Sequence, residues 1–297
     1  MTMKRQLLIL LFALPAIGFS QGSNILEYTP SKLLRKGQID IKWFNNLYTE
    51  SFGVDENRDR FDFDRRYFFT SNFEVMYGLT ENKRVNVGLI ANFRSTLLNS
   101  PESSYGFSDL IQFGNETGIS RSGLSAIAPT IRYSPKKVKA SFSIQSSFFI
   151  PLIDKESEGG VYLDKKSFVW ETRLFYDKTF RGKYQLFLES GGALHLGEEL
   201  DYVQEIGGYA NNSFNLPVSA FFSYFINSKS TIYAMTQHAQ LIPLGNDFAQ
   251  NFTQSGLGAK WQFTPAANLE LLYTNFWRGN STGLGETFNV GLRVLVN

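Results

Sequence analysis

Oppositely charged side chains recur two residues apart in several stretches of this sequence. Asp40 and Lys42 show this spacing, and Glu171 and Arg173 repeat it. Because alternate residues of a β-strand share one face, such pairs would project both signs of charge to the same side of a sheet. Unlike charges on one face can form ion pairs, or they can line a path that selects charged solutes.

The two histidines are the candidates for acid–base catalysis. A His–Ser nucleophilic pair needs a nearby serine. Leu196 and Gly197 follow His195, however, and Ala239 and Gln240 follow His238. A triad built from distant residues remains the alternative. We therefore predict no enzyme and no catalytic residue, and we expect both histidines to hydrogen-bond near the outer ends of strands.

Two segments resemble metal or phosphate sites, but their spacing fails. Asp55–Asp59 matches the start of a calcium loop, yet Arg60 replaces the glycine and Arg66 the glutamate that such a loop requires. A loose divalent site among the aspartates of segment 55–64 stays open beside a solvated acidic loop. The glycine-rich segment 279–286 lacks the Gly–Lys–Ser/Thr ending of a phosphate loop. We predict no metal site and no cofactor.

The elements that would position these charges are strands. Between Arg65 and Thr96 apolar and polar residues alternate on both sides of the turn Thr80–Arg84, and this period of two indicates a β-hairpin. Tyr67 and Tyr77 bracket the apolar face. At ~3.3 Å per residue and a tilt of ~40°, their spacing covers roughly 25 Å, the height of an outer-membrane apolar band. The hairpin predicts two strands of a transmembrane β-barrel.

Similar alternation continues to the end of the chain and predicts about twelve strands, an even number as in single-chain bacterial barrels. Besides the hairpin, the expected strands are Gln38–Tyr48, Ser125–Tyr133, Ala140–Ile150, Phe168–Tyr176, Tyr184–Leu196, Phe214–Phe225, Thr231–Leu241, Gln254–Phe263, Leu269–Trp277 and Thr287–Val296. The predicted fold class is all-β, an antiparallel transmembrane β-barrel with short periplasmic turns and long extracellular loops.

The lengths of the connections support this topology because short and long ones alternate. The short ones are 80–84, 134–139, 177–183, 226–230 and 264–268, and the long ones are 49–64, 97–124, 152–167, 197–213, 242–253 and 279–286. Over these assignments the long loops carry a net charge of about −13, and the short turns with the lead-in carry about +9. Such segregation is typical of a barrel whose two ends face different compartments.

The beginning of the chain has the pattern of a secretion signal. Basic Lys4 and Arg5 precede an apolar stretch too short to span a bilayer. We predict a signal peptide at 1–20, a periplasmic lead-in at 21–37 and a transmembrane β-barrel at 38–297. Removing the signal leaves 27 basic against 27 acidic residues, so the sequence indicates no nucleic-acid partner. Since the chain has no cysteine, it has no disulfide framework.

The segments Ser20–Gln21, Thr29–Gln38 and Lys42–Tyr48 resemble outer-membrane β-barrels of Gram-negative bacteria, specifically flavobacterial barrels of the Bacteroidota with no assigned activity. This resemblance implies a location in the cell outer membrane, in contact with lipid and lipopolysaccharide. The chain departs from the pattern at its end, Val294–Asn297, where many such barrels place an aromatic residue.

Charged residues on the inward face of the predicted strands are the candidate site. They are Asp40, Lys42, Arg66, Glu74, Arg94, Arg132, Glu171, Arg173, Glu189, Lys260, Glu270 and Arg293. Pairing the hairpin about the midpoint of 177–183 places Glu171 opposite Glu189, with Arg173 diagonal to Glu189 and able to bridge both carboxylates.

Two functions of different class follow from this lumen. The first is a narrow passive channel or transporter for small solutes, with mixed charge along its wall. The second is a filled barrel that serves as a scaffold or subunit of an outer-membrane complex, because twelve strands lie between filled and open barrels in size. Loop 97–124 is rich in apolar residues, which we expect to fold into the lumen or against another outer-membrane protein.

Overall fold

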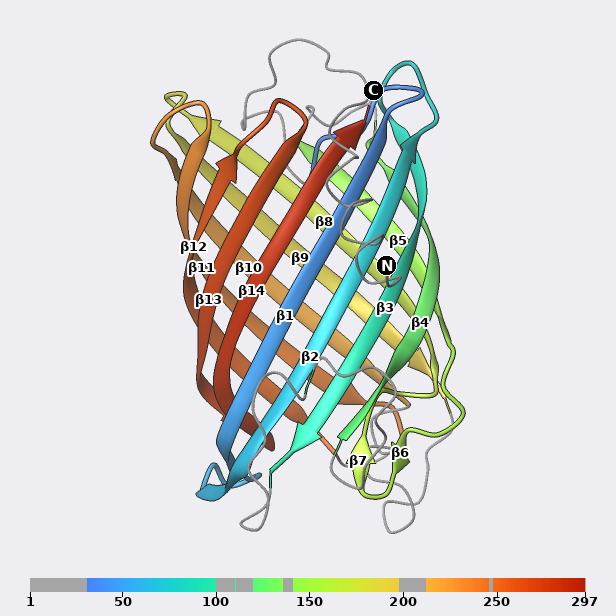
Figure 1. Cartoon of the computed structure of the whole chain (residues 1–297), viewed down its shortest axis with the longest axis vertical. Helices are drawn as coiled ribbons and strands as arrows, with labels where there is room; N and C mark the ends of the chain where they lie inside the picture. The colour runs from blue at the N-terminus through green and yellow to red at the C-terminus, as the bar shows by residue number, and fades with distance from the viewer. Residues whose placement is uncertain are drawn as a thin grey trace, which may run out of the picture.

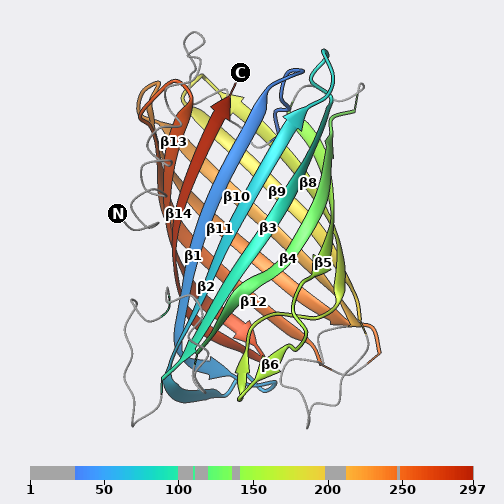
Figure 2. The same ribbon diagram turned by 45° about the vertical axis from the view of Figure 1, so that its right-hand side comes forward.

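Twelve antiparallel strands close into one barrel in the computed structural model of the chain (Figures 1 and 2). The structure describes residues 31–99, 110, 120–135, 141–197, 212–245 and 248–296. Each strand pairs with its neighbour in sequence, and β1 also pairs with β14. A separate two-stranded hairpin, β6–β7, lies in the connection between β5 and β8. The predicted fold class is confirmed.

The barrel strands tilt strongly across the wall, and most of them have 13 to 16 residues (Figure 2). Their bounds are β1 Ile39–Val54, β2 Arg60–Gly78, β3 Val85–Leu98, β4 Ser120–Tyr133, β5 Phe142–Pro151, β8 Phe168–Phe180, β9 Tyr184–Leu196, β10 Asn212–Phe225, β11 Ser230–Pro243, β12 Gln250–Gln262, β13 Ala267–Asn280 and β14 Thr282–Val296. The hairpin strands are β6 Ser157–Glu158 and β7 Val161–Tyr162.

Two of the predicted long loops are wrong, because the strands continue through them. Segment 49–64 belongs mostly to β1 and β2, which leaves 55–59 as the connection, and 279–286 shrinks to a turn at Ser281. Val54 at the tip of β1 pairs with both Arg60 and Thr282. The ends of β2, β1 and β14 therefore extend together, since each supplies backbone partners to the next.

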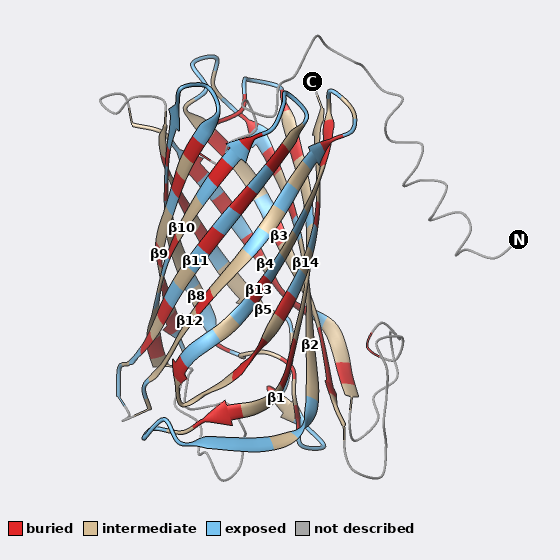
Figure 3. Cartoon of the chain, turned by 90° about the vertical axis from the view of Figure 1, so that its left-hand side faces the viewer, coloured by how far each residue is buried: buried red, intermediate tan, exposed pale blue. Residues whose placement is uncertain are grey.

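Burial alternates along the barrel strands as the period of two predicts (Figure 3). Large apolar side chains lie on the outside, with Leu257 70% and Trp277 57% exposed, whereas inward polar residues such as Gln145 are buried. The Trp170 indole donates to the Ser146 hydroxyl at 2.9 Å. An apolar outer belt around a polar interior is the pattern of a transmembrane barrel. The described residues contain no helix long and apolar enough to cross a membrane.

The end of the lead-in packs against the inner wall at the short-turn end of the barrel. Leu33 and Leu34 are buried. The Leu34 amide donates to the Asn86 side-chain oxygen at 3.2 Å, and the Gly37 amide donates to the Gly78 carbonyl at 3.0 Å. These contacts place residues 31–37 of the predicted lead-in within the opening of the barrel. The predicted signal peptide lies outside the described residues.

The division into two faces predicts opposite effects for basic substitutions at adjacent positions of β2. Phe73 is 45% exposed on the outer face, about halfway up the apolar band, whereas Asn72 lines an interior cavity. We expect Phe73→Arg to lower the stability of the inserted barrel by about 2–4 kcal/mol, the range for a basic residue near the bilayer midplane. Urea unfolding in lipid vesicles measures this change.

Asn72→Arg is the matched control, because its new charge points into the polar lumen. It should still give a folded band that shifts on heating in gel electrophoresis. Equal loss of folding in both variants would contradict the assigned facing of β2.

Candidate functional site

A cluster of five predicted lumen residues lies toward the short-turn end of the barrel. The Arg293 guanidinium donates two hydrogen bonds of 2.8 Å to the carboxylate of Asp40 and so links the last strand to the first. Lys42 pairs with Glu74, and its Nζ lies 3.7 Å from Asp40. Arg132 lies 3.7 Å from Glu74. The five residues alternate in charge, so each buried carboxylate has a cation beside it, as burial requires.

Two further ion pairs lie along the wall formed by β8 to β13. Arg173 pairs with Glu189, and Lys260 pairs with Glu270 at 3.2 Å. Together with Lys42, Glu74, Arg132 and Arg293 these residues line an interior cavity of about 370 Å³. The structure thus brings eight of the twelve predicted residues to one cavity.

The predicted pairing of Glu171 with Glu189 is wrong. Glu171 lies opposite Ala193, and Phe175 is the residue opposite Glu189. The turn is formed by Arg181 and Gly182, which both have positive φ. It therefore lies later in the chain than the midpoint of segment 177–183, about which the pairing was predicted. Arg173 still reaches Glu189 diagonally, as expected, but Glu171 lines a different cavity nearer the long-loop end.

The connection 152–167 folds into the barrel mouth at the long-loop end. The Arg121 guanidinium donates to the carbonyls of Glu156 at 2.9 Å and Lys155 at 2.8 Å, and Glu156 is fully buried. Arg94, a predicted lumen residue, pairs with Asp164 of this connection at 2.9 Å. The sequence predicted that loop 97–124 folds into the lumen or against another protein, and it gave no signal for Arg121 and Asp164, because their partners lie far away in the sequence.

A mouth cavity of about 350 Å³ lies beside this connection, lined by Arg94, Glu171, Lys165 and His195 among others. Lys165 Nζ lies 3.5 Å from His195 Nδ1. Burial in the mouth, together with the charge of Arg94, lowers the pKa of Lys165 to about 8. The mouth thus holds a lysine whose charge can change in mildly alkaline solution.

The remaining predicted site residue, Arg66, lies apart from both cavities. Its Nη1 is 3.9 Å from Glu50, and its side chain is 43% exposed. Within loop 97–124 the structure describes Leu110, which is buried and accepts a hydrogen bond of 2.7 Å from the Ser95 hydroxyl. Leu110 therefore packs against β3, whereas Tyr105, Phe107, Ile111 and Phe113 of that loop lie outside the described ranges.

Aromatic rings on the inner wall were not among the predicted site residues. Phe44, Phe187, Phe221 and Tyr233 line a cavity of about 240 Å³ that adjoins the larger one. The signal was present in the sequence, because these rings occupy the same inward parity as the charges. The predicted site included charged residues alone and therefore lacked these rings.

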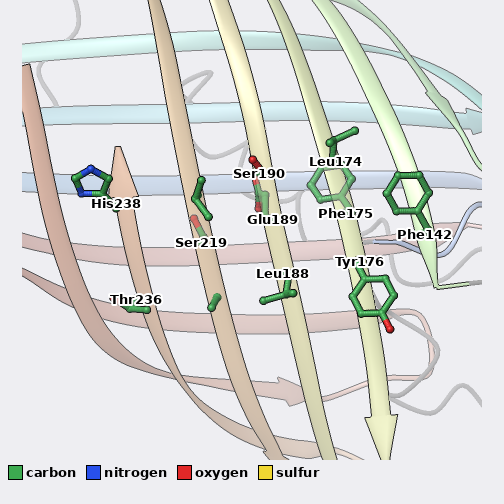
Figure 4. Close-up of a pocket in the computed structure, with 12 residues that line it drawn as sticks. Phe142, Leu174, Phe175, Tyr176, Leu188, Glu189, Ser190, Ser219, Thr236 and His238 are labelled. Carbon is green, nitrogen blue, oxygen red and sulfur yellow. The ribbon is translucent and has the colours of Figure 1, made fainter. Parts of the chain in front are cut away.

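A hollow of about 450 Å³ lies on the wall of β5 and β8 to β11, and the small side chains of Ser190 and Thr236 are part of its lining (Figure 4). Leu188 and Val218, which line it, are 39% and 50% exposed on the outer face. His238 also faces outward there and lies 3.0 Å from the Thr253 hydroxyl. His195 and His238 therefore lie on opposite faces of the wall.

The described residues contain no group of three or more His, Cys, Asp or Glu side chains able to hold a metal ion. The aspartates of segment 55–64 instead shape their own connection. The Asp55 carboxylate accepts hydrogen bonds of 2.8 Å from the amides of Asn57 and Asp59, and Asp62 pairs with Arg60.

Solved structures with a similar fold are outer-membrane barrels. The COG4313 outer membrane channel from Pseudomonas putida F1 matches with a TM-score of 0.67 and 10% identity, over 94% of this chain and 100% of that one. The beta domain of the Bordetella autotransporter BrkA matches with a TM-score of 0.54 and 9% identity, over 86% and 99%. This chain has the fold of an outer-membrane β-barrel. That fold agrees with the predicted location in the cell outer membrane. Comparisons with protein-family models and with curated sequences give no match.

The pair that joins the first strand to the last should be important for stability. The side chains of Asp40 and Arg293 are 3% and 12% exposed, so Asp40→Asn would leave a buried cation without its main partner. We expect a loss of about 3–5 kcal/mol in the free energy of unfolding, measured by urea titration in vesicles. Glu81→Gln removes a carboxylate from an exposed pair with Lys36 and should have little effect. Equal losses of stability in the two variants would contradict the role of the Asp40–Arg293 pair.

The lowered pKa of Lys165 predicts a pH-dependent stability. Below about pH 8 the folded state bears the full cost of burying the charged lysine, and between about 8 and the ordinary value of 10.5 it releases a proton that the unfolded state keeps. Stability should therefore rise with pH across this window. In urea titrations, wild type should approach Lys165→Met as pH rises, whereas Lys165→Arg, which stays charged, should not. Parallel curves for wild type and the arginine variant would contradict this.

Proposed function

We propose that this barrel is a narrow passive channel for small solutes across the outer membrane, with a lumen of mixed charge. The proposal rests on the space that remains inside the barrel and on the charged groups that line it. The side chains leave cavities of about 370 and 350 Å³ inside the wall, and both are lined by charged groups. Charged lining and residual space are what a solute-selecting constriction needs.

The ion pairs support selection by charge rather than unrestricted passage. Arg173 and Glu189 retain side-chain exposures of 35% and 19%, so this pair remains accessible from the cavity. A small ion or polar solute can exchange contacts with such groups as it moves. The similar COG4313 protein is described as an outer membrane channel, which agrees with this function. The Bacteroidota origin inferred from sequence stays a prediction.

A filled scaffold barrel is the second candidate, and the cluster at the short-turn end favours it. Asp40, Glu74 and Arg132 are only 2%, 6% and 4% exposed, and residues 31–37 pack into the same end. A lumen closed at that end would hold the wall together without passing solutes. In that case the barrel would act through its loops, among them 97–124, as a subunit of an outer-membrane assembly.

Conductance of the refolded barrel in a planar bilayer separates the two functions. A channel should conduct, and Arg173→Ala should shift its reversal potential in a salt gradient toward cations, because Glu189 and Glu171 would lose a nearby positive charge. In a filled barrel the wild type should not conduct. The same change should then lower stability by about 3–5 kcal/mol, since it leaves a buried carboxylate unpaired.

Lys178→Ala is the matched control, because it removes the same charge from the exposed side of the same strand, where Lys178 lies over the Phe180 ring. It should change neither reversal potential nor stability. A wild-type barrel that does not conduct would overturn the proposal that it is a channel. A conducting barrel with unchanged selectivity in Arg173→Ala would remove Arg173 from the selecting site.

A further inference from the structure

A row of aromatic rings crosses the inner wall, with one ring on each of four consecutive strands. Phe175, Phe187, Phe221 and Tyr233 lie on β8, β9, β10 and β11, and successive ring centroids are 6.2, 5.4 and 6.0 Å apart. These distances lie in the range of favourable ring–ring contacts. The rings therefore form a continuous apolar stripe, here called the ring row, within an otherwise polar lumen.

Two rings of the lumen lie directly against the backbone of a neighbouring strand. A Cβ added at Gly258 would come within 2.3 Å of the Tyr233 ring, and one added at Gly291 within 2.2 Å of the Phe44 ring. Only glycine permits so close an approach. One side of each ring covers a glycine, and both rings line the same interior cavity. Phe44 on β1 and Tyr233 on β11 thus present ring surfaces to the same space.

That space is the cavity of about 240 Å³, which is small beside the ~300–1,000 Å³ typical of sites for drug-sized ligands. Three rings of the row and Phe44 line it, and polar groups complete its wall. The polar members are Gln185, Ser223, Lys260, Glu270 and Asn289. A cavity of this size and lining fits a solute with a single ring and one polar substituent.

The sign of the substituent follows from the charges around the rings. Among the described residues that line the adjoining larger cavity, five are basic and three are acidic. The guanidinium carbons of Arg132 and Arg173 lie 5.0 and 5.1 Å from the centroid of Phe175, and Lys260 Nζ lies 5.3 Å from that of Tyr233. The ring row therefore has a cation at each end beside its paired carboxylate. The surplus of basic over acidic groups in the adjoining cavity favours an anionic substituent.

We propose that the lumen binds small aromatic carboxylates at the ring row. The aromatic ring of the solute stacks between Phe44 and the rings of Phe221 and Tyr233. Its carboxylate turns toward Lys260, the cation that lines the same cavity. This site names the substrate class of the proposed channel and rests on that function for passage, although binding itself does not require a current.

Calorimetric titration of the full mature barrel in lipid nanodiscs, with empty nanodiscs subtracted, tests the site on the unmodified protein. The probes are benzoate, cyclohexanecarboxylate and benzylammonium. Cyclohexanecarboxylate keeps the charge and nearly the size of benzoate but lacks the aromatic faces, and benzylammonium keeps the ring and reverses the charge. We expect benzoate to bind about tenfold more tightly than either. Equal affinities for the two carboxylates, or tighter binding of benzylammonium, would overturn the proposal.

A pair of adjacent variants localises the site. Phe221→Leu removes an inward ring and should weaken benzoate binding about tenfold. Phe222→Leu removes the neighbouring outward ring, which is 52% exposed, and should leave binding unchanged. The same benzoate affinity in both would overturn the ring row as the site. If Phe221→Leu does not fold, the three-probe comparison on wild type still decides.

Single-channel recording separates this inference from the proposed function. A barrel that conducts but does not distinguish benzoate from cyclohexanecarboxylate keeps its function as a channel and loses the aromatic site. A barrel that binds benzoate selectively without conducting keeps the site and loses the channel.

Discussion

Backbone pairing within the bilayer is the constraint on which this structure depends. Hydrocarbon offers no water to unpaired amide and carbonyl groups, so a membrane-spanning sheet must close on itself. The chain meets this requirement by pairing β1 with β14, from Ile39 opposite Val296 to Val54 opposite Thr282. The bidentate contact between Asp40 and Arg293 lies at one end of this seam. Closure is thus supported by backbone and side chains together.

Closure also explains why the charged residues meet. One face of every strand must contact lipid, so polar side chains are confined to a lumen that twelve strands make only moderately wide. Ionised groups placed so close together, with little water, are stable only beside opposite charges. The alternation from Asp40 through Lys42 to Glu74 follows from that confinement. The open space in the lumen therefore depends on how the side chains fill it more than on the number of strands.

Segments outside the barrel strands narrow the lumen at both ends. Residues 31–37 pack into the short-turn end, and the connection 152–167 enters the mouth through contacts with Arg94 and Arg121. The interior space between them is divided into cavities whose linings differ, charged near Arg94 and partly aromatic near Phe221. A solute crossing the barrel would meet these linings in turn, so each can contribute separately to selection.

The period of two in segments such as Tyr184–Leu196 determined by itself the fold class, the strand count and the facing of residues on most strands, because neighbours on a strand point to opposite sides. The twelve charged candidates were chosen by that parity. Which charges meet was decided by tertiary structure. The turn at Arg181–Gly182 sets a register in which Glu171 lies opposite Ala193, and a local sequence pattern does not encode register. The entry of loop 152–167 and the ring row likewise join residues distant in sequence, and their contacts form only once the barrel has closed.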